Sequence, residues 1–254
     1  MAIAKKLKSP RLRLGYEVEF YLPNHKRIGE VRKLLQAALP DYNVSIRPSS
    51  KRDAEAGMIF VRRDCSLEGN IGYEIVTPPL PVGKANDLLQ KVFGFISLYG
   101  GYTSDDTGLH ANLSLVKIEN NALVTPDRLV LAVGNEDVKE LKKWNRINNE
   151  YCQPTSYEFK RYLKRMIPNY RFLSLAVQQA VGNIDDKCIS VNLNHYERDG
   201  SGYYEFRIMG NRNYHLKYLE VTKSVQKYAK LMVKAANMSQ RQYEKAAKKV
   251  VAGN

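Results

Sequence analysis

The sequence predicts an α+β fold in which helices pack on one face of an antiparallel β-sheet. Two observations favour this fold class. Several short segments alternate apolar and polar residues with the period of two that is typical of a strand, and many of their polar positions are charged. Longer segments with helical spacing lie between these strands and close the chain. With 254 residues, 44% of them hydrophobic, the chain is long enough to bury a core.

The first predicted strand, residues 14–20, shows the alternation most clearly. Its apolar and acidic residues fall on opposite faces, Tyr16, Val18 and Phe20 on one and Glu17 and Glu19 on the other. Two carboxylates on one side of a strand repel each other. They indicate either an edge strand with a solvated acidic face or a site for a divalent cation. The strand alone leaves both interpretations open.

The same two periods predict the remaining elements. Further strands are predicted at residues 43–47, 58–62, 72–77, 108–114, 188–194 and 203–209. Helices are predicted at residues 28–39, 88–99, 135–150, 157–167, 171–181 and 216–237. Thr125 followed by Pro126 begins another helix, and Ser239 with Gln242 forms a capping box for the last one.

The formal charge of +14 is concentrated at the two ends of the chain. Residues 1–13 carry +5 and residues 216–254 carry +7, which leaves only +2 for residues 14–215. We therefore expect a basic N-terminal arm, residues 1–13, and a single domain, residues 14–254, that ends in basic helices. Such ends are either ordinary solvated surface or a surface for a polyanion such as nucleic acid.

The three cysteines, Cys65, Cys152 and Cys188, are scattered and show no CxxC spacing. They suit a reducing compartment and do not indicate a zinc site. No apolar run reaches the length of a membrane span, and the N-terminus lacks the apolar segment of a signal peptide. We therefore expect a cytoplasmic protein that does not bind membranes.

Polar and charged residues on four predicted strands lie opposite apolar faces. If these strands share one sheet, a single face gathers Glu17, Glu19, Glu74, Glu205, His110, Asn112 and Arg207. Four carboxylates do not stay ionised together without cations, so we expect more than one bound metal ion. Oxygen ligands favour Mg²⁺ or Mn²⁺, and Arg207 would bind phosphate beside them. The chain has no GxxxxGK[ST] loop, so metals and arginines would hold any nucleotide.

Six short motifs resemble, in order and spacing, those of the amidoligases related to glutamine synthetase and glutamate–cysteine ligase. They are Gly15-Tyr16-Glu17-Val18-Glu19, Asp64-Cys65-Ser66, Gly72-Tyr73-Glu74-Ile75-Val76-Thr77-Pro78, Gly108-Leu109-His110, Asn149-Glu150-Tyr151-Cys152-Gln153-Pro154 and Tyr204-Glu205-Phe206-Arg207. The resemblance implies the glutamine synthetase/glutamate–cysteine ligase-like catalytic fold, a curved antiparallel β-sheet with helices on one face and C-terminal helices. It also implies ATP-dependent joining of a small-molecule or peptide carboxylate to an amine through an acyl-phosphate.

The resemblance implies roles for the matching residues as well. The implied ligands of Mg²⁺ or Mn²⁺ are Glu17, Glu19, Glu74, His110 and Glu205. His110, Asn112 and Arg207 are candidate contacts of the ATP phosphates, and Arg207 would stabilise the transferring γ-phosphoryl group. Outside the matching motifs, Arg212 is either a second phosphate contact or a loop arginine before the last helix. Asp64 and Ser66 stand where they would either orient the attacking amine or cap a turn.

One position departs from the family pattern. The amidoligases have a second histidine, G-x-H-x-H, where this chain has Asn112, which offers an oxygen to Mg²⁺ but does not titrate near neutrality. A catalytically degenerate amidoligase homologue is therefore an alternative. Another is a nucleic-acid-binding or metal-dependent nuclease-type protein that uses its basic termini, since nucleases also pair metal ions on carboxylates.

Overall fold

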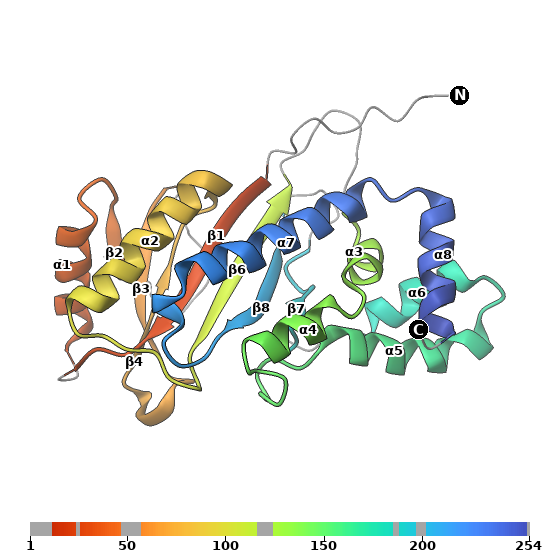
Figure 1. Ribbon diagram of the computed structural model, residues 1–254, viewed down its shortest axis with the longest axis horizontal. Coiled ribbons are helices and arrows are strands. Elements are labelled where there is room, and N and C mark those ends of the chain that lie inside the picture. The colour runs from red at the N-terminus through yellow and green to blue at the C-terminus, as the bar shows by residue number, and fades with distance from the viewer. Residues whose placement is uncertain are drawn as a thin grey trace. The chain divides into compact units, whose positions relative to one another are not determined.

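The computed structural model describes residues 12–23, 26–46, 57–115, 124–184, 188–196 and 202–252 (Figure 1). Within these ranges the protein is a mixed α/β structure with eight strands and eight α-helices. The strands are β1 Leu12–Phe20, β2 Val44–Ile46, β3 Ile59–Asp64, β4 Gly72–Val76, β5 Leu80–Pro81, β6 Gly108–Leu115, β7 Val191–Asn192 and β8 Tyr204–Gly210. The helices are α1 Ile28–Ala38, α2 Val82–Leu98, α3 Pro126–Val133, α4 Glu136–Lys143, α5 Thr155–Met166, α6 Leu173–Gly182, α7 Tyr218–Ala236 and α8 Gln240–Val251.

The chain divides into two compact units. We call Arg13–Leu113 with Phe206–Val225 the sheet unit, and the described residues of 114–205 and 226–252, with Leu12, the helical unit. The single domain predicted over residues 14–254 stays a prediction. Residues 1–11 of the predicted basic arm lie outside the described residues, and its last two residues already belong to β1.

The strands form one mostly antiparallel sheet in the order β2-β3-β4-β1-β6-β8-β7, and β5 also pairs with β1. β4 runs antiparallel to both β1 and β3. The predicted antiparallel sheet is wrong at one edge, where β2 runs parallel to β3. Alternation shows which residues of a strand share a face, but it does not encode the direction of the neighbouring strand.

Helix α2 covers one face of β1. The Tyr16 hydroxyl donates to Oδ1 of Asn86 in α2 at 2.7 Å, and the rings of Phe20 and Phe95 meet edge-on with centroids 6.1 Å apart. Because successive side chains of a strand point to opposite faces, the acidic residues of β1 project from the other side. The prediction of helices on one face of the sheet is thus confirmed at β1.

Two predicted elements are much shorter in the structure than in the prediction, by at least five residues each. The helix predicted over residues 135–150 is only α4, which ends at Lys143, two residues before Asn145 takes a φ of 53°. A residue with positive φ, often Gly or Asn, commonly terminates a helix. The strand predicted over residues 188–194 is reduced to the two residues of β7.

Both predicted helix starts are confirmed. Thr125 precedes Pro126 at the first position of α3, and Ser239 and Gln242 form the capping box of α8. None of the helices in the described part of the chain combines the length and the apolar content that a membrane span requires.

Candidate functional site

Charged residues from three strands form a row on the face of the sheet unit that α2 leaves uncovered. The register between β1 and β4 places Glu19 opposite Glu74, and the register between β4 and β3 places Arg62 opposite Glu74. Side chains directly opposite on antiparallel strands lie about 5 Å apart on the same face. The row therefore brings two like charges together at its centre, with one guanidinium at its end.

On the other side of β1, strand β6 contacts both glutamates of β1. His110 Nδ1 lies 3.3 Å from Glu17 Oε2, and His110 Nε2 lies 3.5 Å from Glu19 Oε1. Asn112 donates from Nδ2 to Glu17 Oε1 at 3.0 Å, and the backbone N–H of Gly108 donates to Glu19 Oε2 at 2.5 Å. The side chains that the sequence predicts to converge from β1, β4 and β6 therefore do so.

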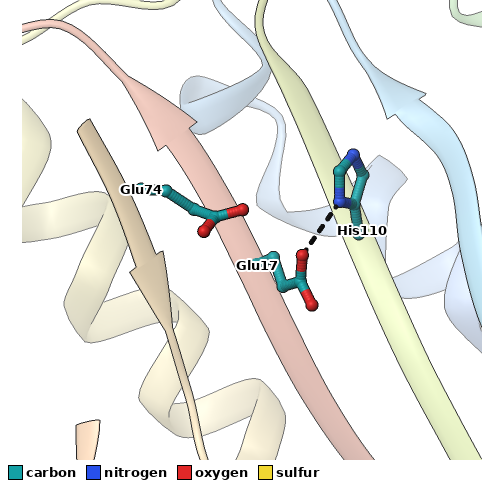
Figure 2. A group of neighbouring side chains, drawn as sticks. All are labelled: Glu17, Glu74 and His110. Carbon is teal, nitrogen blue, oxygen red and sulfur yellow. Dashed lines mark hydrogen bonds and ion pairs between the residues drawn. The ribbon is translucent and has the colours of Figure 1, made fainter. Parts of the chain in front are cut away.

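Two groups of side chains in this cluster have the arrangement of a metal site, and they share Glu74. One ligand atom from each of Glu17, Glu74 and His110 lies within 4.8 Å of the others, and the same holds for Glu19, Asp64 and Glu74. Figure 2 shows the first group, with side chains from β4, β1 and β6 directed toward one another. A carboxylate common to two such groups suits a pair of metal ions.

The chemistry of the donors fits a hard divalent cation. Four carboxylates and one imidazole make an oxygen-dominated set, which Mg²⁺ and Mn²⁺ prefer. Asn112 Oδ1 is buried and, within the described ranges, accepts no hydrogen bond. A buried acceptor of this kind requires a partner, and a cation or its bound water would provide one. Asn112, at the position where the amidoligases have a second histidine, thus has an oxygen that a cation could use.

Burial makes this concentration of negative charge unfavourable. The side chains of Glu74 and Glu19 are almost inaccessible, with 2% and 7% exposure. Burial, followed by the negative charge of Glu17, raises the pKa of Glu74 to about 8, although the guanidinium of Arg62 acts in the opposite direction. Near neutral pH this carboxyl group therefore binds either a proton or a cation.

We expect the affinity for Mn²⁺ to increase as the pH rises towards 8. A pKa raised from 4.5 to about 8 means that Glu74 holds a proton in the folded, metal-free protein over that interval, and a metal ion must displace this proton. One linked proton changes the affinity by about tenfold per pH unit below the pKa, and the affinity then levels off above it. Titration calorimetry at several pH values between 5 and 9 measures the effect.

The raised pKa of Glu74 also determines whether the stability of the metal-free protein rises or falls with pH. Because the unfolded chain holds fewer protons on Glu74, the contribution of this group to metal-free stability falls as the pH rises from 4.5 through about 8. Glu74→Gln is the control, since its affinity for Mn²⁺ should be weak and lack this pH dependence. A wild-type affinity that does not change over this interval contradicts the prediction.

Arg62 is the member of the cluster that the sequence analysis missed. Its Nε donates to Glu74 Oε2, and the arginine side chain is 28% exposed. Among the residues that the structure describes, Glu74 is the only ion-pair partner of Arg62. The signal was present in the sequence, because Arg62 stands two residues before Asp64 on the same strand and so shares its face.

Replacing Arg62 by glutamine should destabilise the metal-free protein and make its stability depend on Mg²⁺. At pH 9, where Glu74 is ionised in the metal-free protein, its buried carboxylate would lose its charged partner, which costs about 1–3 kcal/mol. A bound cation would replace that charge, so Mg²⁺ should recover most of the loss in Tm. A melting curve with and without Mg²⁺ measures both effects.

Arg63→Gln is the matched control for this variant. The neighbouring Arg63 donates to the carbonyl of Lys26 at 2.7 Å and lies over the Tyr73 ring, 4.5 Å from its centroid. Loss of these contacts should also lower Tm, but Mg²⁺ should not restore it. Equal recovery by Mg²⁺ in both variants would show that Arg62 does not neutralise a metal ligand.

Asp64 and Ser66 lie where β3 ends beside the row. Oδ1 of Asp64 accepts hydrogen bonds from the backbone N–H and the hydroxyl of Ser66, at 2.9 and 2.6 Å. The following Leu67 packs directly on Gly72, where a Cβ would lie 2.1 Å from Leu67 Cδ1. This close approach fixes the turn in front of β4. Asp64 thus caps the turn and also belongs to the second ligand group.

Strand β8 carries Glu205 and Arg207. Glu205, in the helical unit, is buried, accepts a hydrogen bond from Asn192 Nδ2 at 2.7 Å and lies 3.5 Å from His195 Nε2. His195 is isolated in the sequence, and it reaches Glu205 because the backbone N–H of Tyr203, two residues before Glu205, donates to the carbonyl of His195 at 3.0 Å. Arg207, two residues further along, is half-buried in the sheet unit.

Arg212 lies beyond the end of β8, on the surface of the sheet unit. Its side chain is 70% exposed, and Nη2 lies 3.5 Å from Oδ2 of the equally exposed Asp105. An exposed pair of this kind contributes little to stability. The described contacts therefore place Arg212 beside an acidic residue, and its predicted contact with a phosphate stays a prediction.

Comparisons with known proteins give no family assignment. No protein-family model matches the chain, and no curated protein matches it. Among solved structures, the chain is similar to the cryo-EM structure of glutamine synthetase from Plasmodium falciparum, with 14% sequence identity and a TM-score of 0.39. The match covers 94% of this chain and 52% of the synthetase, so this chain spans about half the length of that protein.

Proposed function

We propose that this protein is an ATP- and Mg²⁺-dependent ligase that forms an amide bond between a carboxylate and an amine through an acyl-phosphate. The observation that carries the proposal is the pair of ligand groups that share Glu74 on the face of the sheet opposite α2. The amidoligase-like motifs support it, because the glutamates and the histidine of these groups stand at the motif positions.

The reaction depends on charge neutralisation more than on a strong base. An oxygen of the substrate carboxylate attacks the γ-phosphorus of ATP, the bond from that phosphorus to the bridging oxygen breaks, and ADP leaves. The amine then attacks the acyl carbon, the carbon–oxygen bond breaks, and inorganic phosphate leaves while the amine loses a proton. Phosphoryl transfer of this kind relies mainly on positioning and electrostatic stabilisation.

The two ligand groups account for the metal requirement. Glu17, Glu74 and His110 would hold one ion, and Glu19, Glu74 and Asp64 a second. Bound Mg²⁺ supplies positive charge to the phosphate oxygens of ATP. The contacts of Gly108 and Asn112 with the two glutamates of β1 hold those carboxylates in place.

Two further residues would act on the reacting groups directly. Arg207 would bind an oxygen of the γ-phosphoryl group, where its planar fork matches the geometry of phosphate. Asp64 would attract the substrate ammonium group and accept the proton that the amine loses. Ser66 would hold Asp64 in place through its hydroxyl. Glu205 stays a predicted metal ligand.

The test replaces the unknown amine with hydroxylamine. The protein is incubated with ATP, Mg²⁺, hydroxylamine and separate pools of amino acids, dicarboxylic acids and short peptides, and ADP and hydroxamate are measured. An acyl-phosphate gives the two products in equal amounts. With the active pool resolved to one compound, a carboxylate labelled with ¹⁸O should pass one labelled oxygen to inorganic phosphate.

Other outcomes would favour the alternatives. Cleavage of DNA or RNA that needs Mg²⁺ but not ATP would indicate a nuclease-type protein. Binding of ATP and Mg²⁺ without ADP formation in any pool would indicate a catalytically degenerate homologue. Either result contradicts the proposed ligase activity.

A further inference from the structure

We propose that the helical unit binds single-stranded nucleic acid through a surface on α5 and the start of α6. The surface, called the α5 surface below, consists of Tyr157, Arg161, Lys164, Arg165, Arg171 and Phe172. It lies outside both chain ends where the sequence concentrates its charge. The inference is independent of the proposed ligase activity, whose two ligand groups lie in the sheet unit.

The charge of this region is not balanced locally. Residues 159–184 include five basic residues and no acidic one. Lys164, Arg165 and Arg171 are exposed, and none of them has an acidic partner within ion-pair distance in the described ranges. Only Arg161 is paired, with Glu158 one turn earlier. The surface therefore keeps a net positive charge, which attracts a polyanion.

The geometry of α5 gathers these groups on one side of the helix. Tyr157, Arg161 and Lys164 follow one another at helical spacing, whereas Phe159 and Leu163 are buried on the opposite side. At a rise of 1.5 Å per residue, the stretch from Tyr157 to Lys164 is about 10 Å long. Arg165 follows Lys164 on α5. Helix α6 packs against α5 (Figure 1), and Arg171 and Phe172 stand just before α6.

Two aromatic rings on this surface are left exposed. Tyr157 is 53% and Phe172 58% exposed. The guanidinium of Arg171 lies 5.6 Å from the Phe172 centroid. Tyr157 stands one helical turn before Arg161 on α5. Exposed rings beside guanidinium groups suit unpaired bases, which stack on the rings while their phosphates contact the cations. A duplex keeps its base faces covered, so the surface favours a single strand.

An anionic membrane also attracts cations, but it suits this surface less well. A helix that lies on a membrane buries a continuous apolar stripe. The exposed side of α5 instead carries three cations next to one ring. We therefore assign the surface to nucleic acid, and binding to anionic vesicles in its place would overturn the assignment.

The experiment measures binding of the full chain to fluorescently labelled oligo(dT), oligo(U) and a DNA duplex, each of about 20 nucleotides per strand, across a range of salt concentrations. We expect both single strands to bind more tightly than the duplex. In the triple variant Lys164→Gln, Arg165→Gln and Arg171→Gln, affinity should fall at least tenfold. The negative slope of log affinity against log salt concentration should become shallower by about two. Each lost phosphate contact removes about 0.7 from this slope, and the variant loses three cations.

The matched control removes the same charge from another helix of the helical unit. Arg241, Lys245 and Lys248 are exposed on one side of α8, and changing all three to glutamine should lower affinity less than threefold. An equal loss in this control would overturn the assignment to the α5 surface and favour the basic C-terminal helices. Failure of the wild-type chain to bind any oligonucleotide at low salt would overturn it as well.

A second variant separates stacking from plain charge attraction. Tyr157→Ala with Phe172→Ala should weaken single-strand binding about tenfold or more, because each stacked base contributes on that scale. The salt slope should stay unchanged, since no cation is lost. Unchanged affinity in this variant would contradict the stacking surface. All the variants are at exposed positions, so melting curves and hydroxamate formation should match those of the wild type.

Discussion

Replacing Glu74 by glutamine should abolish the stabilisation by Mg²⁺ and reduce ligase turnover by about a thousandfold. Glu74 belongs to both ligand groups, so its loss weakens two ion sites at once. Metal ions contribute several kcal/mol of transition-state stabilisation in reactions of this class, and each 1.36 kcal/mol corresponds to a factor of ten. Glutamine keeps the shape of the side chain at this buried position, so the fold should survive.

The measurement combines melting curves with the hydroxamate assay. Wild-type Tm should rise with Mg²⁺ and rise further with ATP, because both bind the native state only. Glu17→Gln removes a ligand from one group and should keep part of the rise, whereas Glu74→Gln should keep almost none. Glu220→Gln, exposed on α7 in the sheet unit, removes the same charge elsewhere and should behave as the wild type. A full Mg²⁺ response in Glu74→Gln would show that the shared carboxylate binds no metal.

The convergence of this site was predictable because strand alternation is a local property. Residues two apart on a strand share a face whatever the strand pairs with, so Glu17 and Glu19 had to lie together. An apolar face opposite them had to be covered, and α2 does cover it through Tyr16 and Phe20. The motif order then indicated that His110 belongs to the same cluster, and its contacts with β1 agree.

The pairing partners were not predictable in the same way, because they depend on register between distant segments. Arg62 was as visible in the sequence as Asp64, but only the register of β3 with β4 shows that it faces Glu74. The contact of His195 with Glu205 likewise depends on register, since the backbone N–H of Tyr203 donates to the carbonyl of His195 just before β8. Local periodicity determines the face of a side chain, and the register determines its neighbour.

Replacing Arg207 by lysine should reduce turnover about a hundredfold or more while the protein keeps its fold. Arg207 is half-buried on β8, and the flanking Phe206 and Ile208 are fully buried on the opposite face. Lysine retains the charge and the apolar stem but loses the planar fork, so the swap is not conservative at a phosphate site. Losing one oriented donor to a developing negative charge costs about two to three powers of ten in rate.

The effect should fall on turnover more than on nucleotide binding, because the guanidinium matters most when charge develops on the transferring phosphoryl group. Hydroxamate formation, ATP affinity and Tm are therefore measured for Arg207→Lys beside Arg32→Lys, a half-buried arginine of α1 that donates to the carbonyl of Val44 at 3.4 Å. The control should keep wild-type turnover. If Arg207→Lys unfolds the protein, the arginine is structural. If its turnover equals that of the control, Arg207 does not act on the phosphoryl group, and the role implied by the amidoligase resemblance is wrong at that position.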